Sequence, residues 1–278
     1  MNIPSIPHGL VLSDLKWKYL CRSVEKGRNI LIVGPSGCGK TMCAQSVAAA
    51  YRDPKKFFVF NLGATQDPRG YLIGNTHFRP DCGTYVSTSL FVEAIQVPNA
   101  VILLDEISRG HFDAWNILMS VLDERQKYLR IDEHPDSPTI QVADGVCFIA
   151  TANIGNEYTA TRVLDRGLLD RFTNIIEMEP LSLADEMKLL NDLYCNIPGI
   201  EPIATIASFT RNEVQKDTSK LSVILSTRST KEMASMLVDG FTLAEIAEVC
   251  IYPLYSPAGG VQSQRTFMKQ LVQRYLTA

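Results

Sequence analysis

The sequence has no excess of charge of either sign and no long apolar run. It carries 27 lysine and arginine residues against 30 aspartate and glutamate residues, which gives a net charge of −3. This balance leaves room for a local basic patch but does not indicate a protein that binds nucleic acid through its bulk charge. No window reaches the roughly 18 uninterrupted apolar residues of a membrane span, and residues 1–8 lack the basic and apolar parts of a secretion signal. We therefore expect a cytoplasmic protein without membrane contact.

The sequence lacks any cluster of cysteines, because its seven cysteines are scattered along the chain. The cysteines form no Cys-x-x-Cys pair, and no histidine lies near them at the spacing of metal ligands. This pattern favours reduced, mostly buried thiols over a zinc site. The seven cysteines are Cys21, Cys38, Cys43, Cys82, Cys147, Cys195 and Cys250.

What the sequence does contain is a series of short apolar runs of strand length. The runs are continuous rather than alternating, which is typical of parallel strands that are covered on both faces by helices. Five strands are therefore predicted, and their number suits a chain of 278 residues with 46% hydrophobic residues. They span residues 29–33, 57–60, 100–104, 146–150 and 174–177.

Helical patterns lie between these runs, at residues 41–51, 89–95, 111–123 and 161–169. Strand and helix in alternation predict an α/β, doubly wound fold. After Pro180 the strand signal fades and the remaining pattern is mainly helical. We therefore expect an α/β nucleotide-binding domain over residues 1–179 and a helical lid domain over residues 180–278.

Two stretches interrupt this alternation and are predicted to be inserted hairpins. Residues 70–88 contain several turn-forming residues between two β-prone pieces, Tyr71–Ile73 and Thr84–Ser87. Residues 127–142 pair two further β-prone pieces around a turn rich in aspartate and proline. The alternative interpretation of each is a solvated surface hairpin without a function of its own.

The first predicted strand leads directly into a glycine-rich loop and then a helix. Its sequence fits the phosphate-binding pattern G-x-x-x-x-G-K-[ST], which requires that structural context. In such a loop the glycines allow backbone N–H groups to point at phosphate, and the start of the helix adds more donors. The lysine is predicted to contact the β- and γ-phosphates of ATP and the threonine to bind Mg²⁺; a glycine-rich turn without a ligand is the alternative. The predicted residues are Gly34, Pro35, Ser36, Gly37, Cys38, Gly39, Lys40 and Thr41.

Two carboxylates end the strand of residues 101–104. Asp105 and Glu106 should emerge at the carboxyl edge of the sheet, where ligands of such folds bind. Asp105 is predicted to hold Mg²⁺ and Glu106 to polarise the attacking water. A strand that ends in acids is a weak signal by itself, but together with the phosphate-binding loop it is a strong one.

A third apolar strand ends in an amide, Asn153. A single asparagine at a strand end is usually a turn former. Here it follows two strands that also end in candidate site residues. Its side-chain amide could therefore hold the attacking water on the side opposite to Glu106.

The order of these motifs resembles the AAA+ superfamily, and specifically the group of MoxR, CbbQ and dynein-related proteins with an insert in the second helix. The resemblance covers nearly the whole chain. It implies a P-loop AAA+ core and a ring of identical subunits, expected to be a hexamer, in which both hairpins face the central pore. Ala152 and the lack of a proline after Asn153 depart from the pattern of many MoxR proteins, which loosens the subgroup assignment.

The resemblance also gives candidates for two arginine roles. Arg171, in the segment Leu168-Leu169-Asp170-Arg171-Phe172, matches the finger that enters the neighbouring subunit's site; Arg166 is the competitor and Arg162 a weaker one. An always-charged planar guanidinium suits the charge on a departing phosphoryl group. The alternative is a purely structural role, in which these arginines lie on a surface helix face and pair with Asp165 and Asp170. Arg228, at a helix start in the lid, corresponds to the sensor-2 arginine, with an ordinary surface arginine as the alternative.

Three functions remain open from the sequence. The first is an ATPase that remodels or activates a partner protein as MoxR and CbbQ chaperones do, the partner being a separate polypeptide, in some relatives one with a von Willebrand factor A domain. The second is a nucleic-acid motor or a McrB-like NTPase, in which Lys127, Arg130 and His134 would touch phosphates and GTP could replace ATP. The third is a scaffold that binds ATP to assemble but seldom hydrolyses it, against which Glu106 and Asn153 speak.

Overall fold

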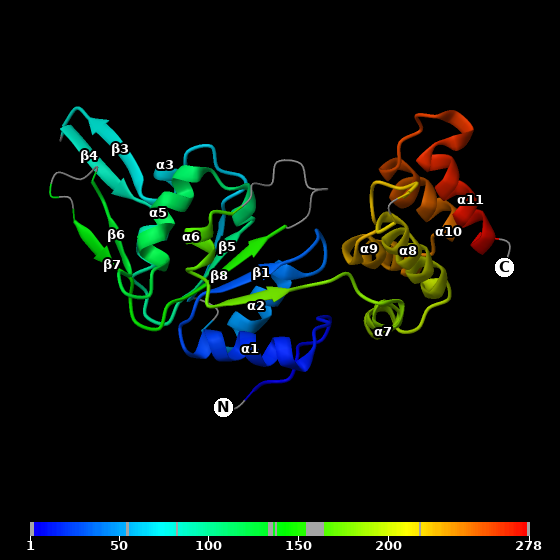
Figure 1. Ribbon diagram of the computed structural model, residues 1–278, viewed down its shortest axis with the longest axis horizontal. Helices are drawn as coiled ribbons and strands as arrows, with labels where there is room; N and C mark the ends of the chain where they lie inside the picture. Colours follow the sequence, from blue (N-terminus) through cyan, green and yellow to red (C-terminus); the bar gives the residue numbers. More distant parts are fainter. Residues whose placement is uncertain are drawn as a thin grey trace. The chain divides into compact units, whose positions relative to one another are not determined.

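The computed structural model describes residues 3–53, 56–81, 83–132, 136, 138–153, 164–216 and 218–276 (Figure 1). The chain forms two compact units. The first comprises Met1–Pro7, Leu12–Pro35 and Lys40–Met178, and the second comprises His8–Val11, Ser36–Gly39 and Glu179–Ala278. None of the described helices is long and apolar enough to cross a membrane.

A five-stranded parallel sheet forms the centre of the first unit, which confirms the predicted α/β fold. In spatial order its strands are β2 (Phe57–Asn61), β5 (Val101–Asp105), β8 (Cys147–Ala152), β1 (Ile30–Val33) and β9 (Asn174–Glu177). Every residue of β1 and β8 is buried, as expected for strands with both faces covered. Val33 pairs with Ala152, and Leu104 with Ala150, so three of the strands end at the same edge beside one another.

Helices cover both faces of this sheet (Figure 1). One face carries α1 (Asp14–Glu25) and α2 (Lys40–Tyr51), and the other carries α3 (Pro68–Leu72), α4 (Leu90–Ala94), α5 (Phe112–Leu122) and α6 (Arg166–Leu169). The core on the second face joins Leu31, Phe60 and Leu104 of the sheet to Trp115 and Leu168 of the helices. Predicted helix residues 161–163 lie outside the described part of the chain.

Both inserted hairpins are present at one end of the first unit (Figure 1). The first pairs β3 (Gly74–Arg79) with β4 (Gly83–Thr88), and the second pairs β6 (Tyr128–Arg130) with β7 (Thr139–Gln141). The expected strand character of Tyr71 and Leu72 is wrong, because these residues belong to α3. The side chain of Asp67 accepts a hydrogen bond from the Gly70 amide and Pro68 occupies the first turn, which together start a helix there.

The second unit is built from helices. They are α7 (Leu183–Tyr194), α8 (Ile200–Val214), α9 (Thr227–Val238), α10 (Leu243–Ile246) and α11 (Gln264–Leu276). The same unit contains a π-helical segment, Ala247–Ile251, and two 3₁₀ turns, Tyr252–Leu254 and Gly260–Gln262. A further 3₁₀ turn, Ile107–Arg109, follows β5 in the first unit. Ile203, Leu225, Met233, Ile251 and Met268 contribute to a core separate from that of the first unit.

Candidate active site

The loop after β1 has the backbone that its glycines predict. Gly34, Gly37 and Gly39 have φ angles of 152°, 77° and 94°, a region that other residues rarely adopt. The Gly34 amide donates to the Ala152 carbonyl at 3.2 Å, which ties the start of the loop to the end of β8. The loop residues Ser36, Gly37, Cys38 and Gly39 belong to the second unit, whereas Gly34, Pro35, Lys40 and Thr41 belong to the first.

Lys40 is the first residue of α2 and its side chain is largely buried, with 9% of the residue exposed. Its ammonium donates to the carbonyls of Gly34 and Pro35 at 2.9 and 2.8 Å and to Asn153 Oδ1 at 2.7 Å. The three donors of the ammonium therefore all meet oxygen acceptors. The positive charge is held at the junction of β1, α2 and β8, between the loop and the amide that the sequence indicated.

Thr41 and Asp105 lie within hydrogen-bond distance of one another. The Thr41 hydroxyl is 3.2 and 3.3 Å from the two carboxylate oxygens of Asp105. A hydroxyl and a carboxylate are hard oxygen donors of the kind that Mg²⁺ takes together with phosphate oxygens and water. The donor set therefore fits the magnesium ion that the resemblance to AAA+ proteins implies, and when bound this ion would neutralise charge on the phosphates.

Glu106 occupies a left-handed backbone conformation, with φ 56° and ψ 41°. This conformation is uncommon outside glycine and turns the chain sharply at the end of β5. The carboxylate of Glu106 lies 3.2 Å from the Arg109 guanidinium, and both side chains are partly exposed. A Cβ on Gly63 would lie 2.6 Å from Glu106 Oε2, so only glycine leaves room for the carboxylate at this point.

Thr151 links these acids to β8 and was not predicted from the sequence. Its hydroxyl accepts a hydrogen bond from the Glu106 amide at 3.0 Å and donates to Asp105 Oδ1. The residue is 1% exposed. The signal was present, because Thr151 is a polar residue within an apolar strand and lies two positions before Asn153, on the same face.

Ser108 is a second site residue that sequence reasoning missed. It lies just beyond Glu106 and is 2% exposed. Its hydroxyl accepts a hydrogen bond from the backbone N–H of Asn153 at 3.3 Å, which links the end of β8 to the turn after β5. The structure therefore brings Lys40, Asp105 and Asn153 together at one edge of the sheet.

The two candidate finger arginines have different surroundings. Arg171 forms an ion pair of 3.1 Å with Asp123 of its own chain, and its side chain is 33% exposed. Backbone N–H groups of Arg125 and Gln126, and then the charge of Arg171, hold the pKa of Asp123 below its ordinary value of 3.8. Arg166 is exposed at the start of α6 and has no polar partner among the described residues.

Arg228 lies in the second unit, in the first turn of α9, and its side chain is exposed. The candidate Arg162 lies outside the described residues. The structure thus groups the loop lysine, Thr41, the two acids and Asn153 within the first unit.

Comparisons with known proteins cover most of this chain. Residues 29–172 match the sequence profile of the AAA domain, dynein-related subfamily. BssE of Thauera aromatica, to which a chaperone role is provisionally assigned, is 33% identical over 220 residues, covering 78% of this chain and 72% of that protein. The Lon protease of Leptospira interrogans is 30% identical over 234 residues, 76% of this chain but 26% of that protein. A mitochondrial Lon homologue of Dictyostelium discoideum is 30% identical over 62% of this chain and 18% of its own length.

Proposed function

Because the chain belongs to the AAA family, in its dynein-related subfamily, we propose that it hydrolyses ATP with Mg²⁺ in a ring of identical subunits and thereby remodels or activates a partner protein. One observation carries the catalytic part of this proposal: at the carboxyl edge of one sheet, the consecutive residues Lys40 and Thr41 bond to Asn153 and to Asp105, respectively. Ligands of such sheets bind at this edge.

The chemistry follows from the residue types. Lys40 supplies a positive charge for the phosphates, and Thr41 and Asp105 supply oxygen ligands for Mg²⁺. Glu106 accepts a proton from the attacking water while Asn153 orients it. Arg109 lies 3.2 Å from the Glu106 carboxylate and helps to fix its position.

We propose Arg166 as the arginine that reaches a neighbouring subunit. The sequence pattern favoured Arg171, but Arg171 is engaged with Asp123 of its own chain. Arg166 is exposed and without a polar partner in the described part of the chain. A guanidinium supplied from a second subunit would make hydrolysis depend on assembly, which is why a ring, with a hexamer as the expected form, belongs to this proposal. Arg228 is proposed to contact the γ-phosphate from the lid.

A protein rather than a nucleic acid is proposed as the substrate, in the cytoplasm. BssE, with its provisional chaperone role, supports this choice. On the β3–β4 hairpin Phe78 is 72% exposed, which offers an apolar contact to a protein. On the β6–β7 hairpin the charge of Arg130 is offset by Asp132 at 2.6 Å, which weakens the case for phosphate binding there. A partner with a von Willebrand factor A domain remains the expected type.

The test is ATP turnover by the Glu106→Gln variant. This change keeps the size of the side chain and removes its basicity, so ATP binding and ring assembly should persist while turnover falls about 10²- to 10⁴-fold. Glu93→Gln, an exposed glutamate on α4, is the matched control and should keep the parental rate. Parental turnover in Glu106→Gln would show that Glu106 is not the base.

The same variant serves to find the partner. An ATP-loaded ring that cannot turn over should retain its substrate, so Glu106→Gln protein should recover a polypeptide that parental protein releases. Salt-sensitive retention of DNA in place of a polypeptide would instead support the nucleic-acid motor.

A further inference from the structure

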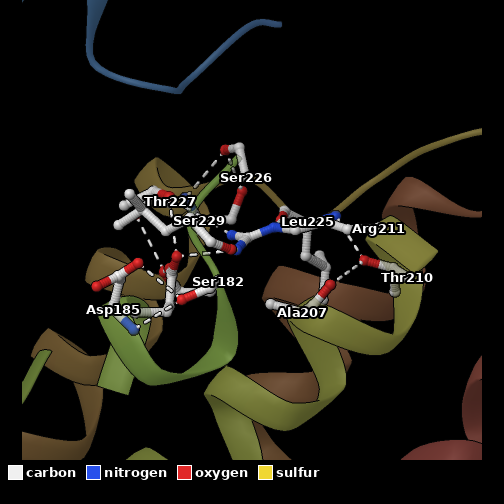
Figure 2. A network of polar contacts seen from close by, with 12 residues as sticks. Ser182, Asp185, Ala207, Thr210, Arg211, Leu225, Ser226, Thr227 and Ser229 are labelled. Atoms are coloured by element: carbon white, nitrogen blue, oxygen red, sulfur yellow. Dashed lines mark hydrogen bonds and ion pairs between the residues drawn. The ribbon is translucent and has the colours of Figure 1, made fainter. Parts of the chain in front are cut away.

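The second unit contains a buried polar network that joins three of its helices (Figure 2). Its centre is an ion pair between Glu186 of α7 and Arg211 of α8, with 2.9 Å between Nη1 and Oε2. Glu186 is 0% and Arg211 is 5% exposed. Charged groups are seldom buried this completely unless their hydrogen bonds are satisfied.

Arg211 uses its planar fork to reach two segments besides Glu186. Nη1 also donates to the Leu181 carbonyl at 3.0 Å, and Nε donates to the Leu225 carbonyl at 3.1 Å. Leu225 directly precedes Ser226, the residue that caps α9. The guanidinium therefore holds the chain just before α9 to the chain just before α7.

Glu186 extends the network into the first turn of α9. Its carboxylate accepts from the Thr227 hydroxyl at 3.0 Å and from the hydroxyl of Thr230, which is fully buried. The Thr210 hydroxyl of α8 accepts from the Leu225 amide at 3.0 Å (Figure 2). Most bonds of the network thus end on residues 225–230.

Stability alone gives a weak reason for such a pair. Replacing a buried ion pair by apolar residues of similar volume is often neutral or stabilising, because removing both charges from water is costly. An apolar cluster does not fix the orientation of the segments that pack against it. A guanidinium and a carboxylate do, because each makes several hydrogen bonds whose directions are set by its planar geometry. The segment so oriented carries Arg228, which lies between Thr227 and Ser229 and projects from the unit as an exposed side chain.

We propose that Glu186 and Arg211 are positioning residues, which fix the first turn of α9 and so set the direction in which Arg228 leaves the helix. This proposal rests on the role of Arg228 in the proposed function. The pair itself does not touch nucleotide and acts only through α9.

The first experiment measures amide hydrogen exchange in Arg211→Lys protein and needs no catalysis. Lysine keeps the charge beside Glu186 but loses the fork that reaches Leu225. The amides of Ser229 and Thr230 should exchange about tenfold faster or more, while those of α11 stay unchanged. Uniformly faster exchange throughout the second unit, or no change in residues 226–230, would overturn the proposal.

Two further variants give this experiment its controls. Arg265→Lys alters another guanidinium of the same unit, whose Nε donates to the Tyr255 carbonyl at 3.0 Å, and should leave the start of α9 unchanged. If Arg211→Lys does not fold, Thr230→Val removes a single hydroxyl from Glu186 and should loosen the same turn, whereas Thr230→Ser should not. An unaltered turn in Thr230→Val would count against the proposal.

The second experiment is a double-mutant cycle in ATP turnover. Arg211→Lys should lower kcat about tenfold to a hundredfold with little change in KM. In an Arg228→Ala background it should cause no further loss, because both changes act through one side chain. An equal loss in both backgrounds would overturn the positioning role. Parental turnover by Arg228→Ala would instead refute the role of Arg228 in the proposed function, and hydrogen exchange would then still decide whether the pair fixes α9.

Discussion

Replacing Thr151 by valine should damage both stability and turnover, although Thr151 contacts neither phosphate nor water in the proposed mechanism. Valine has the same shape and β-branching, so the packing of β8 is preserved. The change removes only the hydroxyl that accepts from the Glu106 amide at 3.0 Å and donates to Asp105.

The magnitude follows from the group left without a partner. A buried N–H that loses its acceptor costs about 1–3 kcal/mol, and the partly buried Glu106 N–H should lie toward the lower end of that range. In a chain of comparable length each kcal/mol lowers the unfolding temperature by roughly 2–4 °C. Glu106 is also held in a left-handed conformation, φ 56°, which is itself costly and depends on such anchors. Both acids should therefore lose orientation, and turnover should fall about tenfold to a hundredfold.

The assay combines thermal unfolding with steady-state ATP hydrolysis. Thr151→Ser is the control, because serine keeps the hydroxyl, and its turnover should stay close to the parental value. If Thr151→Val were as stable and as active as the parent, the bonds from β8 would not hold Asp105 and Glu106 in place, and the reasoning would be refuted.

Three further predictions follow from the same structure. Gly63→Ala should lower turnover with little loss of stability, because a Cβ there would lie 2.6 Å from Glu106 Oε2 and displace the carboxylate; unchanged kcat would show that the contact is unimportant. The lowered pKa of Asp123 means that its contribution to stability is present above the ordinary value of 3.8 and is lost as the pH falls through the lowered value. Asp123→Asn should therefore unfold at a temperature that changes less between about pH 5 and about pH 3 than that of the parent, and an identical profile would contradict this. Arg166→Ala should reduce turnover without altering the unfolding temperature, whereas Arg171→Ala should lower the unfolding temperature through loss of its ion pair with Asp123; the reverse pattern would restore Arg171 as the finger.

The fold was predictable because its signals are local. Each strand of the central sheet is a continuous apolar run, and the glycine-rich loop lies between a strand and a helix within a short stretch of chain. The parallel arrangement then places the ends of β1, β5 and β8 at one edge. The strand prediction at Tyr71 was wrong although the deciding signal is also local. The helix cap provided by Asp67 outweighed the β-propensity of the residues that follow it.

The site was predictable only in part, for a physical reason. Lys40 and Asp105 are recognisable by residue type and position after a strand. Thr151 and Gly63 are not, because their importance depends on which strands are neighbours. Gly63 follows β2 and Thr151 lies on β8, and both meet Glu106 because β5 lies between these two strands.

The α/β core and the order of its motifs can be predicted without a structure, since both depend on periodicity and on residues close together in the chain. The folded chain was needed to show that Arg171 pairs with Asp123 and that Glu186 contacts Arg211 and Thr230. Those contacts join residues far apart in the sequence. The contacts of Glu186 form because packed helices leave its polar neighbours buried, where each must find a partner. The partly exposed pair of Arg171 and Asp123 forms because the ends of α5 and α6 lie close together.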